Sequence, residues 1–523
     1  MKIKEQNINK ILFWLLAIST IVRTVLAAWL EFGNDEVYYW TYALYPDWSH
    51  FDHPPMVGWA IQLFSLNLLF DNELFIRLAS VVFMTANTYI IFRIGKEIKD
   101  ARAGLYAALL FTASIYAFVI TGIFILPDTP LMLFWLLAIW MAIRSLSREP
   151  VEEPKGRYLL LFGLFAGLAM LSKYSGIFLW VGMGIFILFF NRKQLRNPYL
   201  YLALLISAIC CIPILYWNIQ NDFISFRFHE ARVGGNNLNI NSFGTEISGE
   251  FFYNNPVNFI LAIIAVVAVF KKKVYVDKPI QRLILCIAIP TILLFLFFSL
   301  TRPTLPHWNA PAYTSLILLS AVWLRDRNTD SERLPHSITA AIAVLLLTLV
   351  IGVTEIKTGF VPLDKHTEPE MLGRDDFSLD MYGWRQLGKK FAVFREEKIA
   401  EGIMQAEDGI VANQWFPLAH LDYYVARPLD MRAMALGQPE YIHKYLWINK
   451  ERGGFHLSES YWFLTDSRYY KDPKTTYRWY FKDIELVGTI EIERCGKPAK
   501  NVFVYICKNL KSEPKISLPP ETK

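Results

Sequence analysis

The sequence predicts a mostly α-helical, polytopic membrane protein with a C-terminal soluble α+β domain. Of its 523 residues, 54% are hydrophobic and only 19% are charged, whereas soluble domains carry about a quarter charged residues. The mean hydropathy is +0.28, and the apolar residues gather in long runs within the first two-thirds of the chain. After residue 355 the chain becomes polar, mixed in charge and rich in Tyr and Trp. We therefore predict a transmembrane domain over residues 1–355 and a soluble domain over residues 356–523.

About eleven apolar segments are candidates for helices that cross a bilayer, which needs about 20 apolar residues. They cover residues 11–30, 74–92, 104–120, 129–146, 158–172, 176–190, 199–217, 256–270, 281–300, 308–324 and 337–355. Residues 57–70 are apolar but short, so we expect them to lie at the interface or to re-enter the membrane. The first segment follows a basic N-terminus without a small-residue cleavage site, which predicts an uncleaved signal anchor.

The distribution of Lys and Arg predicts the orientation. Basic residues cluster in every second loop, for example at residues 93–102, 192–196 and 271–273. The opposite side carries few of them before the C-terminal part: Arg77, Lys173, Arg227, Arg232 and Arg302. Basic loops stay in the cytoplasm, so we expect a cytoplasmic N-terminus and a periplasmic C-terminal domain in a bacterial inner membrane. The net charge of +6 comes from these loops and indicates topology, with no nucleic-acid partner.

The C-terminal part predicts a helix near residues 384–398 and short strands at 409–414 and 461–465. A final hairpin is expected to turn at residues 496–500, which places Cys507 opposite Thr489. Cys495 would then lie roughly 20 Å from Cys507, too far for a disulfide, so we predict two free thiols. The other three cysteines lie in apolar runs and are expected to pack there.

The most unusual stretch is residues 33–59, which follows the first apolar segment and contains no Lys or Arg. Its Trp and Tyr residues favour the membrane–water interface. Carboxylates beside a bilayer indicate a functional site unless they are paired; the alternative is an acidic, aromatic loop between two spans. The acidic residues and histidines of this stretch are Asp35, Glu36, Asp47, His50, Asp52 and His53.

Other polar clusters fall on the same predicted outer side. They contain Asp128 in the sequence LPDTP, Lys173 and Tyr174 in SKYS, Arg232 in FRFHEAR, and His307 in RPTLPHW. A transporter needs polar groups near the middle of the membrane, whereas a single layer at one face fits a reaction site.

Three of these sequences together resemble a known family: Asp35-Glu36, DHPP at residues 52–55 and LPDTP at residues 126–130. They are similar to membrane glycosyltransferases of the GT-C class, in the superfamily of protein O-mannosyltransferases and lipid A aminoarabinose transferases. The resemblance implies the GT-C fold, a catalytic transmembrane domain and a sugar donor carried on a polyprenyl phosphate.

The resemblance also implies roles for individual residues. Asp35 matches the acidic residue on which catalysis is centred, with Glu36 beside it, and Asp128 matches a second acidic residue. Asp52 and His53 match an acidic–basic pair before Pro-Pro, where lipid A members typically have Glu-Lys. Lys173 and Tyr174 stand where members place a basic residue near that phosphate, and His307 lies in a late motif.

The chemistry of these side chains agrees with such a reaction. Lys173, Arg232 and His53 are suitable partners for a departing phosphate. A carboxylate can act as a general base or stabilise positive charge on the sugar, and direct displacement would invert the anomeric carbon. In the alternative readings, Asp128 caps a helix, Lys173 snorkels and Arg232 is ordinary surface.

The sequence therefore predicts an enzyme that moves a sugar from a polyprenyl phosphate to lipid A, a glycan or a protein. No cofactor is required, although His50, His53 and two nearby Asp could hold a divalent ion; their spacing matches no metal motif. The alternatives are a transporter or flippase of lipid-linked sugars, and an assembly or sensor protein whose C-terminal part binds a partner.

Overall fold

The computed structural model describes residues 4–146, 155–231, 238–274, 276–328 and 332–512. The chain divides into two compact units. Unit 1 comprises Met1–Trp29 and Pro46–Thr348, and unit 2 comprises Leu30–Tyr45 and Leu349–Lys523. The segment 30–45 therefore packs with the C-terminal part of the chain, although it lies in the predicted transmembrane region.

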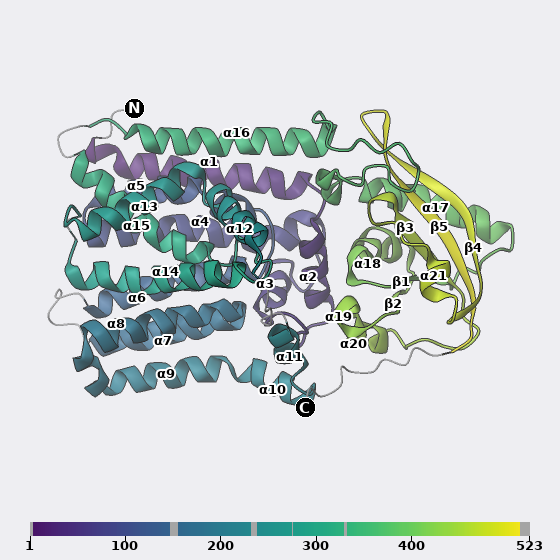
Figure 1. The fold of residues 1–523 in the computed structure, drawn as a ribbon, viewed down its shortest axis with the longest axis horizontal. Helices are drawn as coiled ribbons and strands as arrows, with labels where there is room; N and C mark the ends of the chain where they lie inside the picture. Colours follow the sequence, from purple (N-terminus) through teal and green to yellow (C-terminus); the bar gives the residue numbers. More distant parts are fainter. Residues whose placement is uncertain (1–3, 147–154, 232–237, 275, 329–331, 513–523) are drawn as a thin grey trace. The chain divides into compact units, whose positions relative to one another are not determined.

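Helices cover every apolar segment predicted to cross the membrane (Figure 1). These helices are α1 (Ile8–Trp29), α4 (Glu73–Ile98), α5 (Ala101–Ala113), α6 (Asp128–Leu146), α7 (Lys155–Ser172), α8 (Phe178–Phe190), α9 (Pro198–Cys210), α10 (Ile212–Gln220), α13 (Pro256–Phe270), α14 (Lys278–Ser299), α15 (Ala310–Arg327) and α16 (His336–Thr358). Within the described residues, five helices are long and apolar enough to cross a membrane, or up to seven if each bent pair is one span. The count of eleven spans stays a prediction.

Close helix packing in unit 1 depends on small residues. A Cβ atom at Gly163 of α7 would lie 2.3 Å from the backbone oxygen of Ala203 in α9, and one at Gly167 would lie 2.8 Å from Cys210 Cβ. Glycines four residues apart lie on one face of a helix and allow two backbones to approach, which is a common way of packing helices in membranes. Figure 1 shows α7 and α9 running alongside each other.

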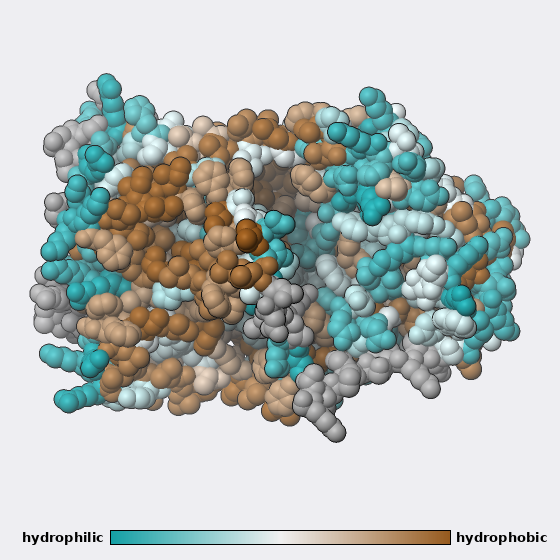
Figure 2. Space-filling model, viewed as in Figure 1, coloured by the Kyte–Doolittle hydropathy of each residue, from teal (hydrophilic) through white to brown (hydrophobic). Residues whose placement is uncertain are grey.

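The outer surface of the unit 1 helices is apolar. Figure 2 shows brown, hydrophobic atoms across the helices of unit 1 and teal, hydrophilic atoms at the end where several of its loops lie. Large exposed side chains on this surface include Phe13, Leu188, Phe189, Phe270 and Leu293. A continuous apolar surface of this kind matches the bilayer interior, so unit 1 is built as the membrane part of the protein.

Several predicted spans and connecting segments have an irregular backbone. After α5, Ser114 adopts an extended conformation and a π-helical turn, η2 (Tyr116–Ile120), follows. Helices α9 and α10 meet at 41°. The predicted long loop 217–255 is largely helical, with α11 (Ile224–Ala231) and α12 (Ile240–Tyr253), and α12 meets α13 at 100°. The short apolar segment 57–70 forms α3 (Met56–Phe64) and a turn in which residues 66–68 have positive φ.

Unit 2 contains a five-stranded mixed sheet in the order β2-β1-β3-β5-β4. Its strands are β1 (Gly409–Ala412), β2 (Ala433–Ala435), β3 (Tyr461–Asp466), β4 (Phe481–Arg494) and β5 (Lys497–Leu510). The predicted helix is present as α17 (Trp384–Ala400), and the C-terminal part also contains α18 (Trp415–Leu421), α19 (Pro439–Ile442), α20 (Tyr445–Glu451) and α21 (Pro473–Tyr477). The predicted α+β character of the C-terminal part is confirmed.

The hairpin register corrects one prediction. The turn consists of Cys495 and Gly496, because Arg494 pairs with Lys497, so it is tighter than predicted. Cys507 pairs with Ile484 instead of lying opposite Thr489, because the turn lies earlier in the chain than predicted; the two register shifts along the strands cancel before Cys507. Both cysteines are free, as predicted, with Cys495 exposed and Cys507 buried.

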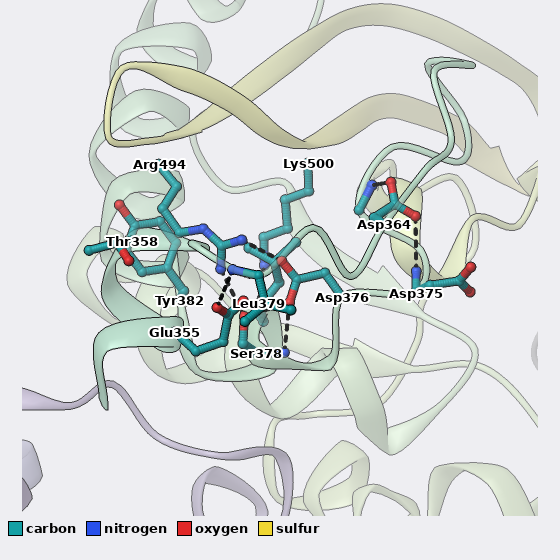
Figure 3. A network of polar contacts seen from close by, with 12 residues as sticks. Glu355, Thr358, Asp364, Asp375, Asp376, Ser378, Leu379, Tyr382, Arg494 and Lys500 are labelled. Carbon is teal, nitrogen blue, oxygen red and sulfur yellow. Dashed lines mark hydrogen bonds and ion pairs between the residues drawn. The ribbon is translucent and has the colours of Figure 1, made fainter. Parts of the chain in front are cut away.

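A network of polar contacts joins the end of α16 to this hairpin within unit 2 (Figure 3). The Arg494 guanidinium forms an ion pair with Asp376 and donates to Ser378 Oγ over 2.8 Å. Glu355 in α16 accepts from the backbone nitrogen of Val361 over 2.9 Å, and the fully buried Lys500 donates to the backbone oxygen of Leu379. These contacts fix the chain that follows α16 against strands β4 and β5.

Candidate functional site

The centre of the candidate site in unit 1 is a buried ion pair between Asp128 and Lys173. Lys173 Nζ lies 2.7 Å from Asp128 Oδ2, and the two residues are 6% and 2% exposed. Tyr116 donates its hydroxyl to Asp128 Oδ1 over 3.0 Å. The ammonium of Lys173 points to a buried carboxylate, so snorkelling towards water does not describe this side chain.

Local sequence explains how these two side chains come together. Asp128 begins α6 with Pro127 and Pro130 on either side of the first residues, and proline favours the first turn of a helix. Lys173 directly follows the last residue of α7 and has an extended backbone. Both residues therefore lie at helix ends, and the extensive packing of α6 against α7 holds those ends together.

Two histidines lie close to the ion pair. His53 and His307 each interact electrostatically with both Lys173 and Asp128. Burial, with a smaller contribution from the positive charge of Lys173, lowers the pKa of His53 to about 3 and that of His307 to about 4. Both imidazoles are therefore neutral near pH 7, and each can donate one N–H hydrogen bond.

The DHPP turn and α11 form the next part of the site. His229 Nε2 donates to the backbone oxygen of Asp52 over 2.8 Å, and the ring centroid of His229 lies 6.4 Å from that of His53 and 5.1 Å from that of Tyr174. The hydroxyls of Tyr174 and Ser225 lie 2.9 Å apart. The structure thus gathers residues from four predicted outer clusters: Asp52 and His53, Asp128, Lys173 and Tyr174, and His307.

Sequence reasoning missed several residues of this site. His229 and Ser225 lie in the segment around FRFHEAR, for which the sequence predicts only Arg232 as a site residue. Arg232 is outside the described residues. The four-residue spacing of Ser225 and His229 in the amphipathic helix α11 was a usable signal.

Asp35 and Glu36 belong to unit 2, in the first turn of α2 (Asn34–Leu44). Glu36 is buried, and its carboxylate accepts from the backbone nitrogen of Gly33 over 2.9 Å, which satisfies the amide of the residue before the helix. Asp35 is exposed. The neighbouring ring of Tyr38 packs against Trp415 of α18, with centroids 4.9 Å apart. The two adjacent carboxylates therefore differ, one serving the helix end and the other facing outward.

The structure does not gather the suggested metal ligands around residues 47–53. Among the described residues, three potential ligand atoms lie within 4.8 Å of one another only at Asp364, His366 and Asp375, in unit 2. Asp364 accepts there from the backbone nitrogens of Gly373 and Asp375 over 2.8 and 3.2 Å, as Figure 3 shows for Asp375. Its oxygens are thus already used in the turn.

Comparison with solved structures identifies the fold class. The chain shares its fold with ArnT from Cupriavidus metallidurans, in the apo state (TM-score 0.62, 13% identity, 95% of this chain and 98% of that one). A second structure of ArnT from the same organism, bound to undecaprenyl phosphate, matches with a TM-score of 0.59 and 14% identity over 94% of this chain and 97% of that one. The fold is therefore the GT-C fold that the sequence predicted.

Comparisons with known sequences match parts of the chain. Residues 52–217 match the family model described as dolichyl-phosphate-mannose-protein mannosyltransferase. The chain is similar to the lipid A galacturonosyltransferase RgtD of Rhizobium johnstonii, with 24% identity over 302 residues. That match covers 56% of this chain and 60% of the length of the relative. The matched family region contains Asp52, His53, Asp128, Lys173 and Tyr174.

Proposed function

We propose that the protein is a membrane glycosyltransferase that takes a sugar from a polyprenyl-phosphate donor. The observation that carries this proposal is the buried pair of Lys173 and Asp128 with the neutral His53 and His307 beside it. The relatives support the donor class, since one solved structure of ArnT holds undecaprenyl phosphate. We place the reaction at the outer face of a bacterial inner membrane.

The proposed task of the unit 1 site is to bind the donor phosphate. Lys173 has three N–H donors, one of which is used by Asp128. The others, together with the N–H groups of the two neutral histidines, can donate to phosphate oxygens. Charge-assisted hydrogen bonds of this kind stabilise a phosphate as negative charge develops on it.

In the proposed transfer, the bond between the anomeric carbon and the phosphate oxygen breaks, and its electron pair stays on the phosphate. An acceptor oxygen forms the new bond to that carbon from the opposite side, which inverts the anomeric configuration. The proton of a hydroxyl acceptor passes to a carboxylate, for which Asp35 is the proposed base and Asp128 the alternative. An ionised phosphate acceptor has no proton to lose, so the carboxylate would then only stabilise charge on the sugar.

The acceptor is lipid A, a glycan or a protein. RgtD is named as a lipid A galacturonosyltransferase, which favours lipid A and a uronic acid or related sugar. The family model is described for protein mannosylation, which keeps a protein acceptor in consideration. Mass spectrometry of lipid A and envelope glycans from cells with and without the gene would separate these acceptors.

The direct test uses washed membranes that contain the protein and a labelled polyprenyl-phosphate sugar. Transfer of the label to an endogenous acceptor is the expected result, and Lys173→Ala should abolish most of it. Label that becomes protected inside vesicles without transfer would instead indicate a flippase. A chain that neither transfers nor protects the label would contradict both functions.

A further inference from the structure

The loop that carries His307 has little structure of its own. Residues 300–309 join α14 to α15 without forming a helix or strand. Pro303 and Pro306 have no backbone N–H to donate, and around His307 the backbone contacts are Trp308 N to Leu305 O at 2.9 Å and Ala310 N to His307 O at 3.4 Å. The position of His307 must therefore depend on contacts from other elements.

Helix α12 supplies such contacts from one face. Its residues Glu246, Gly249, Glu250 and Tyr253 recur at helical spacing, so they lie on the same side of the helix. Glu246 Oε2 accepts from Thr304 Oγ1 over 2.7 Å. The ring centroid of Tyr253 lies 6.2 Å from that of His307. On the other side of His307, the Asn309 side chain donates to Glu250 Oε1.

Gly249 brings the helix into direct contact with the residue before His307. A Cβ atom at this position would lie 2.0 Å from Cγ and 2.6 Å from Cβ of Pro306. The backbone of Gly249 is helical, so glycine is required here for space and not for its conformational freedom. A proline ring cannot move away without moving the loop.

The two carboxylates of α12 are almost completely buried. Glu246 is 0% and Glu250 is 1% exposed. Glu250 accepts a second hydrogen bond from the Tyr313 hydroxyl of α15 over 2.7 Å. A buried carboxyl that loses its hydrogen-bond partner is strongly disfavoured, so these acceptors restrict Thr304 and Asn309 to one position. Thr304 and Asn309 lie three residues before and two residues after His307.

We propose that α12 acts as a clamp that positions His307 beside Lys173 and Asp128 for contact with the donor phosphate. Glu246, Gly249 and Glu250 are the positioning residues. This inference rests on the proposed function, because the position of His307 affects the reaction only if the donor phosphate binds in the unit 1 site.

The kinetic test compares two glycines of the same helix in the full-length protein. Gly249→Ala would force Pro306 to move, whereas a Cβ atom at Gly244 meets no atom within 4 Å, so Gly244→Ala is the matched control. A misplacement of about 1 Å can reduce the rate about 10²-fold. We expect Gly249→Ala to lower kcat/KM for the donor by about this factor and Gly244→Ala to keep the wild-type value.

Coupling to His307 distinguishes positioning from general damage. Two changes that act through the same group are not additive, so Gly249→Ala should cause no further loss in a His307→Ala background. Thr304→Ser should keep activity because it retains the hydroxyl, whereas Thr304→Val should resemble Gly249→Ala. Wild-type kinetics in Gly249→Ala, or an undiminished further loss in the His307→Ala background, would overturn the clamp.

Hydrogen exchange of the peptide covering residues 301–309 tests the clamp without any substrate. Gly249→Ala should accelerate exchange there, and Gly244→Ala should not. Unchanged exchange in Gly249→Ala would overturn the clamp even if the wild type transfers sugar. Faster exchange combined with no sugar transfer by the wild type would reject the proposed function and, with it, the role of the clamp in the reaction.

Discussion

At the scale of single residues, the proposed phosphate contact of Lys173 can be separated from its effect on stability. Removing it leaves the carboxylate of Asp128 buried without its ion-pair partner, which typically costs about 3–5 kcal/mol. We expect Lys173→Ala to raise the donor KM more than Lys173→Arg, because Arg keeps the positive charge. Donor titration of purified variants, together with thermal unfolding, measures both effects.

A double variant separates these two effects. Lys173→Ala combined with Asp128→Asn removes the buried charge, so it should recover part of the lost stability but none of the lost donor affinity. Wild-type donor kinetics in Lys173→Ala would limit the residue to a structural role.

Asp35 and Glu36 form a natural pair of matched variants. If Asp35 is the general base, Asp35→Asn should reduce turnover about 10²–10⁴-fold with little change in donor binding. Glu36→Gln removes the negative charge from the first turn of α2 but keeps an oxygen that can accept from the Gly33 nitrogen, so it should lower stability by about 0.3–1 kcal/mol and affect turnover less. Single-turnover transfer across pH measures the first effect, and thermal unfolding the second.

Either outcome of this comparison is informative. Transfer at the wild-type rate by Asp35→Asn would move the proposed base to Asp128. A loss in Asp35→Asn that is mild at every pH would indicate an acceptor that is already ionised, such as a phosphate.

His53 and His307 predict how stability changes with pH. Their pKa values of about 3 and 4 lie below the ordinary value of 6.5 because burial disfavours the charged imidazole. Below about pH 6.5 the unfolded chain binds protons at these positions that the folded chain does not bind. Their contribution to the free energy of unfolding is therefore complete above about pH 6.5. It is lost progressively as the pH falls from 6.5 towards 4 and 3.

Thermal unfolding between pH 7 and 5 measures this dependence. The double variant His53→Gln/His307→Gln should lose less stability over that range than the wild type. His456→Gln serves as the control, since that residue is exposed in unit 2. An identical slope in the double variant and the wild type would contradict the neutral state of the two buried histidines.

At the scale of elements, the turn of the β4–β5 hairpin allows a prediction of how single residues change the stability of the hairpin. Cys495 and Gly496 have φ values of 52° and 74°, and two-residue hairpin turns with two positive φ values favour Asn-Gly. We expect Cys495→Asn to keep or raise the stability of the hairpin and Cys495→Val to lower it by about 1–2 kcal/mol. Hydrogen exchange of the amides in β4 and β5 gives the measurement.

Cys495→Ser is the control for this turn, because it removes the thiol without adding a branched side chain. If Cys495→Val exchanges no faster than Cys495→Ser, the positive φ at this position does not limit the hairpin.

At the scale of the whole molecule, the prediction concerns membrane topology. A reporter fused after Glu355 should be active only outside the cytoplasm, and one inserted at residues 271–273 only inside, because the Lys and Arg bias places those loops on opposite sides. Fusions at both sites in the full-length chain, assayed with one reporter active in each compartment, give the measurement. A cytoplasmic C-terminal part would contradict the placement of the reaction at the outer face.

The sequence alone determined the helical membrane region, the α+β C-terminal part and the GT-C resemblance, because apolar runs, strand alternation and short motifs are local properties of a chain. It also singled out Asp52, His53, Asp128, Lys173 and His307, because polar residues are rare beside apolar segments. Helix α12 was not predicted, because its local sequence lacks such a signal. Its buried face carries Glu246 and Glu250, so the apolar periodicity that reveals most helices is missing there.

Only the tertiary structure decided which of these residues act together. The ion pair of Lys173 and Asp128 spans 45 positions of the chain, and the contact of His229 with Asp52 spans 177. The different surroundings of Asp35 and Glu36, which are neighbours in sequence, depend on the cap and packing of α2 within unit 2. Contacts between distant segments follow from how helices pack, and that packing depends on the whole set of side-chain shapes, which no local pattern in the sequence contains.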